Sequence, residues 1–382
     1  MKENRVLREK ASSVFSMARA VPIFSITVLV ACFLLLFAAE PTSARIQLLA
    51  NESIPAIFVF GDSILDTGNN NGLLASPCRS NFPPYGRAFD GGVPTGRFSD
   101  GRVPSDFMVE ELGIKDTLPA YKDPNLKLEE LLTGVNFASG CVGFDDLASK
   151  LGMVPPLSQQ LREFNDYVNK VKEMIGEEAM AKLLAKSIVI ISLCSNDIVQ
   201  AYFNSHIREL QYDFSTYADI LVKSATTFLM ELYSIGCRRI GMFGAPPLGC
   251  IPFIRTMTGG VERMCSERHN QASQLYNSKL ISSMNSLQSS GNLDPDARLV
   301  YLDLYDPMMH LIVNYRSYGF EVADKGCCGM GQVEMSVLCN KYNPYTCTDG
   351  SKYVFWDSYH PTEKTYKLLV SQCIAGYLHS FL

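Results

Sequence analysis

The chain has 382 residues, of which 47% are hydrophobic and 19% are charged, and its formal net charge is −5. This hydrophobic content is enough for a sizeable core, which argues against intrinsic disorder. The small charged fraction and the acidic balance leave no extended basic surface, so the composition gives no support to nucleic-acid binding.

The N-terminus has the pattern of a secretory signal peptide. Basic residues precede an apolar stretch at 21–39, and the Thr-Ser-Ala sequence at 42–44 resembles a signal-peptidase site. The apolar stretch is long for a signal peptide, so an uncleaved membrane anchor is the alternative. We expect cleavage after Ala44, which leaves a secreted chain of residues 45–382 without a transmembrane segment. Asn51 begins the one glycosylation sequon.

The cysteines fit an oxidising compartment. Twelve are present, and one of them lies in the predicted signal peptide. The remaining eleven are an odd number, which implies at least one free thiol. Four lie close together in a glycine-rich segment, for which disulfides are expected and a zinc site is the alternative: Cys327, Cys328, Cys339 and Cys347.

The chain alternates between predicted strands and helices. An apolar run at 56–60 predicts a short buried strand, and a long loop region rich in Gly, Pro and Asn follows at 69–127. Further strands are predicted at 134–138, 187–194, 239–243 and 297–304, and helices at 103–112, 155–175, 177–185, 216–235, 262–288 and 361–378. This alternation favours one doubly wound parallel sheet in a single domain.

Polar residues follow several of these strands. In an open α/β sheet the carboxyl ends of the strands face the ligand crevice, and Ser63, Gly140 and Asn196 lie at such ends. A hydroxyl at Ser63 is well placed for a nucleophile, although a serine there can also simply cap a helix. Asp357 precedes His360 by three residues, so a local turn could place the carboxylate under the imidazole. The alternative is a surface aspartate beside a helix-start histidine.

These motifs, taken together, resemble the plant GDSL esterase/lipase family. The resemblance rests on Phe-Gly-Asp-Ser at 60–63, the segment 134–140, Asn-Asp at 196–197 and Asp-x-x-His at 357–360. Pro-Leu-Gly-Cys at 247–250 and Gly-Cys-Cys-Gly at 326–329 are also similar to the plant branch. The segment 353–360 resembles the extracellular lipases of anther and pollen coat, and the whole resemblance covers 57–378.

The resemblance implies the SGNH-hydrolase fold, a three-layer α/β/α sandwich with a mostly parallel, flavodoxin-like, five-stranded sheet. It implies Ser63 as nucleophile, His360 as general base and acid, and Asp357 as the residue that orients His360. The oxyanion hole would combine the backbone N–H groups of Ser63 and Gly140 with the side-chain amide of Asn196. No metal or cofactor is expected.

Two positions depart from the family pattern. Cys194 and Cys141 stand where the family commonly has glycine, and a side chain at either place could narrow the oxyanion hole. Glycine allows backbone angles that other residues resist. We expect an ordinary backbone at Cys194, because the Ser-Asn-Asp sequence directly after it is intact.

The leading hypothesis is a secreted serine esterase or lipase that hydrolyses acyl-lipid or acetyl esters through an acyl-enzyme. By resemblance it would act in the apoplast, the cell wall or the pollen coat, on a small-molecule or lipid ester. An acyltransferase using the same site and a non-catalytic secreted glycoprotein are the alternatives. The Gly-x-Ser-x-Gly nucleophile elbow is absent, which disfavours an α/β-hydrolase.

Overall fold

The computed structural model of the protein describes residues 54–382. The predicted signal peptide (1–44) and the sequon at Asn51 lie outside the described residues, so cleavage and glycosylation stay predictions. Within 54–382, no helix combines the length and apolar character needed to cross a membrane.

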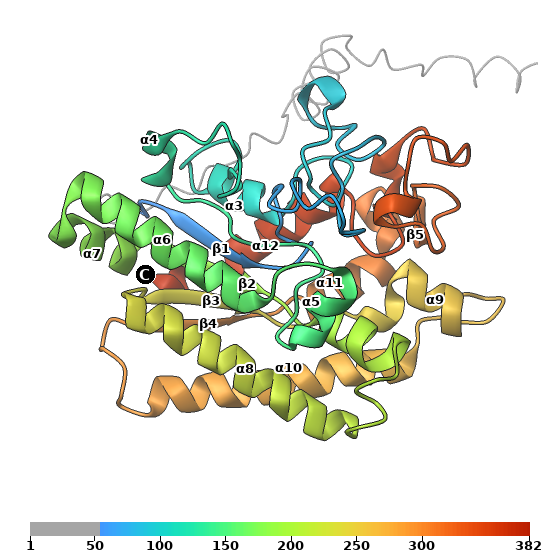
Figure 1. Ribbon diagram of the computed structural model, residues 1–382. Helices are drawn as coiled ribbons and strands as arrows, with labels where there is room; N and C mark the ends of the chain where they lie inside the picture. Colours follow the sequence, from blue (N-terminus) through green and yellow to red (C-terminus); the bar gives the residue numbers. More distant parts are fainter. Residues whose placement is uncertain (1–53) are drawn as a thin grey trace, which may run out of the picture. The chain divides into compact units, whose positions relative to one another are not determined.

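Four parallel strands form the central sheet (Figure 1). Every residue of the first two strands is buried, as expected for a parallel sheet covered on both faces. The strands follow one another across the sheet in chain order: β1 (Ile57–Gly61), β2 (Ile188–Ser192), β3 (Arg239–Phe243) and β4 (Arg298–Leu302).

The segment 134–138, predicted as a strand, runs along the free edge of β1 without forming a regular strand. A single parallel bridge joins Asn136 to Val59, and the Phe137 N–H donates to the Val59 carbonyl at 2.8 Å. Gly134 has φ +97°, and a Cβ there would lie 2.0 Å from the Ile57 carbonyl oxygen. The segment thus occupies the position of a fifth strand, and only a glycine permits its close approach to β1.

The two faces of the sheet carry different hydrophobic clusters. Side chains alternate along a strand, so Phe58 and Phe60 of β1 join one cluster, while Ile57 and Val59 join the other. The first cluster is covered by α6 (Leu157–Ile175), α8 (Phe214–Ile235) and α10 (Glu267–Ser289), the second by α3 (Pro104–Glu111) and α12 (Glu363–Phe381) (Figure 1). The result is the expected α/β/α sandwich.

The long helices and the strands β1 to β4 agree with the sequence-based expectation to within a few residues. The largest shift is in α10, which begins at Glu267 instead of 262, because Cys265 is bound to Cys250 in the turn before it. The elements that were not predicted are short: α4 (Leu128–Leu131), α5 (Asp146–Gly152), α9 (Pro252–Thr258), α11 (Tyr305–Val313), β5 (Val322–Gly326), β6 (Tyr353–Phe355) and the π-helix Asp197–Asn204. The helix α7 (Glu177–Lys186) was predicted.

Four disulfides connect the loops. The glycine-rich segment contains two of them, so its predicted disulfides are confirmed, and the predicted free thiol is found as well. The bonds are Cys78–Cys141, Cys250–Cys265, Cys327–Cys347 and Cys328–Cys339, and the free cysteines among the described residues are Cys194, Cys237 and Cys373.

A glutamine of α6 holds the end of β1. Gln160 is buried, and its side chain accepts the Gly61 N–H at 3.0 Å and donates to the Gly61 carbonyl at 2.8 Å. Its neighbour Gln159 is half-buried, and within residues 54–382 its side chain bonds only to side chains of the same helix, those of Arg162 and Glu163. Because buried backbone groups need partners, the Gln160 side chain stabilises the end of β1.

We expect Gln160→Leu to lower the free energy of unfolding by about 1–3 kcal/mol, because the Gly61 N–H would lose its partner inside the fold. Urea denaturation of the purified protein measures this change. The matched control Gln159→Leu should stay within about 0.5 kcal/mol of the unsubstituted protein. Equal losses in the two variants would show that the Gly61 contacts are not special.

Candidate active site

A serine, a histidine and an aspartate meet at the carboxyl end of β1. Ser63 Oγ lies 2.8 Å from His360 Nε2, and His360 Nδ1 lies 2.8 Å from Asp357 Oδ2. All three residues are buried. The structure therefore brings together the three side chains predicted from the sequence, from opposite ends of the chain.

The turn 357–360 explains the three-residue spacing. Asp357 Oδ1 accepts the backbone N–H groups of Tyr359 and His360 at 2.8 and 2.7 Å, so the carboxylate lies under the imidazole. Asp357 Oδ2 also accepts the hydroxyl of Tyr85 at 2.7 Å, and that hydroxyl accepts the Ser336 N–H. Tyr85 was missed by sequence reasoning, and its only signal was a place in an aromatic, turn-rich loop.

These side chains border a hollow of about 280 Å³. Ser63, His360 and Asn196 line it, together with Cys141 and apolar side chains such as Phe98, whose ring centroid lies 5.0 Å from that of His360. One amide hydrogen of Asn196 is donated to the Val142 carbonyl at 3.0 Å. Its second amide hydrogen is left for a ligand in the hollow.

Gly140, predicted as an oxyanion donor, has its backbone N–H bound within the fold. Its N–H donates to Asp66 Oδ2 at 2.9 Å, and Gly140 does not line the hollow. The next residue, Cys141, does line it, and its N–H donates to no acceptor within residues 54–382. Of these two amides, the Cys141 N–H is the one that is free within the described residues, and its residue borders the hollow.

Cys141 is held in an unusual backbone conformation. Its φ is +67°, in the left-handed region that glycine adopts freely and other residues rarely do. A disulfide joins it to Cys78, which also lines the hollow. A Cβ on Gly152 would lie 2.5 Å from the Cys141 Cβ, so this glycine leaves the space that the disulfide occupies.

The expectation of an ordinary backbone at Cys194 is wrong. Its φ is +102°, a region that a residue with a Cβ enters at a cost of order 1–3 kcal/mol. The side chain is fully buried in the larger hydrophobic cluster, which holds it in place. Asn196 nevertheless lines the hollow beside Ser63, so the strained residue does not turn this side chain away.

Three carboxyl groups are buried around the site. Burial raises the pKa of Asp62 to about 7, of Asp66 to about 6 and of Asp197 to about 8, because a charged carboxylate is poorly solvated there. Asp66 also accepts the Gly68 N–H, and Asp197 accepts two N–H groups of the loop at 144–145. These carboxyl groups connect the loops that surround Ser63.

Asp62 differs from the other two. Its Oδ1 accepts the Ile64 N–H at 3.0 Å, while its Oδ2 has no partner among the described residues. Since the unpartnered oxygen is buried next to Ser63, the protonated form of Asp62 is favoured below about pH 7. No group of three or more His, Cys, Asp or Glu side chains in 54–382 is arranged to hold a metal ion.

Comparison with known proteins agrees with these observations. Residues 57–372 match the GDSL-like Lipase/Acylhydrolase family model. The chain is 48% identical to the GDSL esterase/lipase At5g42170 of Arabidopsis thaliana over 87% of this chain and 88% of that protein. It is 45% identical to GDSL esterase/lipase EXL3 of the same plant, over 92% and 95%.

Among solved structures, an acetylxylan esterase of Geobacillus stearothermophilus aligns over 87% of this chain and 96% of that one, with 12% identity and a TM-score of 0.40. That similarity is too low to carry a conclusion. The family model and the plant relatives span most of the sequence, and the motif residues lie together in the fold. The chain therefore belongs to the GDSL-like lipase/acylhydrolase family and is a carboxylic ester hydrolase.

Proposed function

We propose that this protein hydrolyses esters outside the cell through a covalent acyl-enzyme on Ser63. The observation that carries the proposal is the 2.8 Å contact between Ser63 Oγ and His360 Nε2 inside the hollow. A histidine in this position can take the hydroxyl proton as Oγ attacks a carbonyl carbon.

The reaction then proceeds in two halves. As Oγ bonds to the ester carbon, its proton moves to His360 Nε2 and the carbonyl electron pair moves onto oxygen. Collapse of this intermediate expels the alkoxide, which takes the proton from His360 and leaves the acyl group on Ser63. Water repeats the sequence, with His360 as its base, and releases the carboxylic acid and the free serine.

Asp357 orients the imidazole in this scheme. It accepts the Nδ1–H, which leaves Nε2 as the acceptor that faces Ser63. The Tyr85 hydroxyl and the two backbone N–H groups of the turn fix the carboxylate in place. Tyr85 is a positioning residue, since it acts through Asp357.

The oxyanion would be stabilised by the backbone N–H groups of Ser63 and Cys141 and by the Asn196 amide. Each such donor is worth about 10²–10³ in rate when it is aimed at the developing charge. Gly140 has a supporting role, because its N–H is bound to Asp66 and so anchors the loop just before Cys141. A neutral Asp62 also helps, because no charged carboxylate then opposes the oxyanion next to Ser63.

The proposed extracellular location is supported by the N-terminal sequence and by the disulfides. The described residues contain four disulfides. Disulfides form and persist in oxidising compartments and are rare in the cytosol. Removal of residues 1–44 and glycosylation at Asn51 belong to the same proposal, because both accompany export through the secretory pathway.

A fluorophosphonate probe should label the protein once, at Ser63, and hydrolysis of a panel of esters should be lost in Ser63→Ala. His360→Ala should nearly abolish labelling, because the hydroxyl loses its base. Peptide mass spectrometry locates the label. A label on another serine, or ester hydrolysis that survives Ser63→Ala, would contradict the proposed mechanism.

The role of Cys141 predicts a difference between two variants that both lack the disulfide. Cys78→Ala/Cys141→Gly retains a residue suited to the positive φ, whereas in Cys78→Ala/Cys141→Ala the left-handed conformation costs roughly 1–2 kcal/mol. We expect kcat of the alanine variant to be about tenfold lower or more, with similar KM. Steady-state kinetics measure the difference, and equal kcat values would show that the Cys141 backbone does not serve the reaction.

Asp62 predicts a pH-dependent stability. Its pKa is raised from 3.8 to about 7 in the folded protein. Protonated Asp62 therefore adds to the free energy of unfolding, fully below about pH 3.8, and this contribution is lost as the pH rises through about 7. The free energy of unfolding of Asp62→Asn, relative to the unsubstituted protein, should increase between about pH 5 and pH 7, by up to ~1.4 kcal/mol per pH unit, and then level off. Urea denaturation at several pH values tests this, and a constant difference would contradict it.

A further inference from the structure

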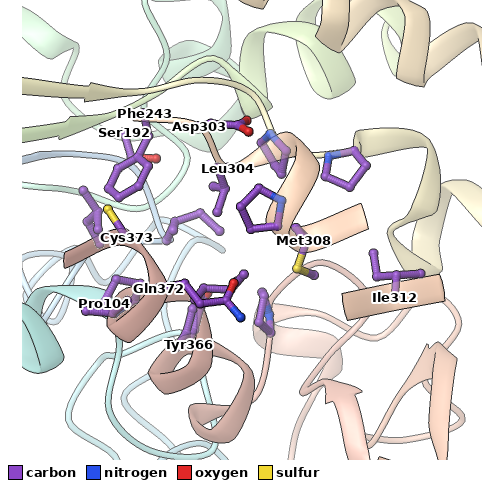
Figure 2. A pocket seen from close by; sticks show the side chains of 18 of the residues that line it. Pro104, Ser192, Phe243, Asp303, Leu304, Met308, Ile312, Tyr366, Gln372 and Cys373 are labelled. Atoms are coloured by element: carbon purple, nitrogen blue, oxygen red, sulfur yellow. The ribbon is translucent and has the colours of Figure 1, made fainter. Parts of the chain in front are cut away.

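A second cavity, of about 90 Å³, lies at the carboxyl ends of the central strands (Figure 2). Ser192 ends β2, Phe243 ends β3 and Leu304 follows β4, and all three line the cavity. The helices α11 and α12 contribute nearly half of its remaining wall, and Figure 2 shows Met308 and Tyr366 among these side chains. Ligands of open α/β sheets bind in this region, outside the carboxyl ends of the strands.

The cavity adjoins the Ser63–His360 pair. Ile64, which follows Ser63, and Pro361, which follows His360, both line it. Tyr359 lines this cavity as well as the hollow that contains Ser63. Tyr359 therefore lies at the border that the two spaces share, with its hydroxyl hydrogen-bonded to Gln200 Nε2 at 2.5 Å.

Most of the lining is aliphatic or proline, and few of the lining side chains are polar. The Tyr366 hydroxyl is buried without a partner among the described residues, and its pKa is raised by burial and by the nearby Asp357 and Asp62. Tyr366 lies in the first turn of α12, six residues after His360, on the part of the cavity wall nearest the catalytic groups in the sequence. The hydroxyl of Tyr377, another lining residue, accepts the Asp303 N–H. Such a mainly apolar cavity suits an aliphatic chain.

We propose that this cavity binds the acyl chain of the ester substrate, an inference that rests on the proposed acyl-enzyme at Ser63. The preferred substrates are then esters with a straight acyl chain of medium length. The acyl group stays on Ser63 through both halves of the reaction, so it needs an enclosed place. The alcohol must leave and water must enter, which suits the Ser63 hollow. That hollow reaches the surface at Leu151, Val337 and Leu338, which are 44%, 44% and 55% exposed.

Filling the cavity tests the proposal. Met308 is buried on α11, and Met308→Trp should occupy the space, while Met174→Trp places the same side chain on the exposed side of α6. Three esters distinguish the two positions of a long chain. Methyl octanoate carries it on the acyl group, octyl acetate carries it on the alcohol, and methyl acetate has none. We expect Met308→Trp to lower kcat/KM at least tenfold for methyl octanoate and to change it less than threefold for the two acetates.

The control Met174→Trp should leave all three esters within threefold. An unchanged preference for methyl octanoate in Met308→Trp would overturn the proposal, and so would a selective loss of octyl acetate. If Met308→Trp fails on all esters, its fold is checked by thermal unfolding, and the milder Met308→Phe replaces it. That variant should lower the ratio of methyl octanoate to methyl acetate hydrolysis in the same direction, and an unchanged ratio overturns the proposal.

Binding separates this inference from the proposed reaction. Binding of methyl octanoate is measured by calorimetry on Ser63→Ala and on Ser63→Ala/Met308→Trp. This measurement does not depend on turnover. Binding to the first that is lost in the second supports the cavity, even if the Ser63 mechanism proves wrong. Equal binding to both overturns the cavity assignment and leaves the Ser63 mechanism untouched.

Discussion

The site depends on how β1 ends at Gly61. Its φ is +151°, and a Cβ there would lie 2.3 Å from the Ser192 carbonyl oxygen of β2. The Ser139 N–H donates to the Gly61 carbonyl, and the Gln160 side chain binds both backbone groups of Gly61. One residue without a side chain thus connects the neighbouring strand, the loop that leads to Cys141, and the helix α6. Any larger residue would displace Ser63, which lies two positions further along the chain.

Sequence reasoning recovered the parts of this arrangement that short stretches encode. Apolar runs predicted β1 to β4, and the triad residues Ser63, Asp357 and His360 each stand in a short motif of their own. Gln160 and Tyr85 could not be found in this way, because their contacts join residues about 100 and 270 positions apart. Residue type does not specify the partner of a backbone N–H either, so the bond from the Gly140 N–H to Asp66 could not be predicted.

Cys141 and Cys194 show two ways in which a fold holds a residue in a conformation that suits glycine. At Cys141 the restraint is covalent, through the bond to Cys78, and it acts at the surface of the hollow. At Cys194 the restraint is packing, since the side chain is fully buried in the larger hydrophobic cluster. With both residues held in this way, Asn196 and Cys141 still line the same hollow as Ser63.

The disulfides and the free cysteines lie in different parts of the fold, and this has a consequence for stability. All four disulfides lie in loops outside the central sheet, and three of them close loops of 11 to 20 residues. Closing such short loops restricts the unfolded chain locally, by about 3 kcal/mol for 15 residues. The free thiols Cys194 and Cys237 lie instead in the hydrophobic core. The sheet is held by apolar burial and the loops by covalent closure, so the redox state of the surroundings acts on the loops that carry the site and spares the layers beneath them.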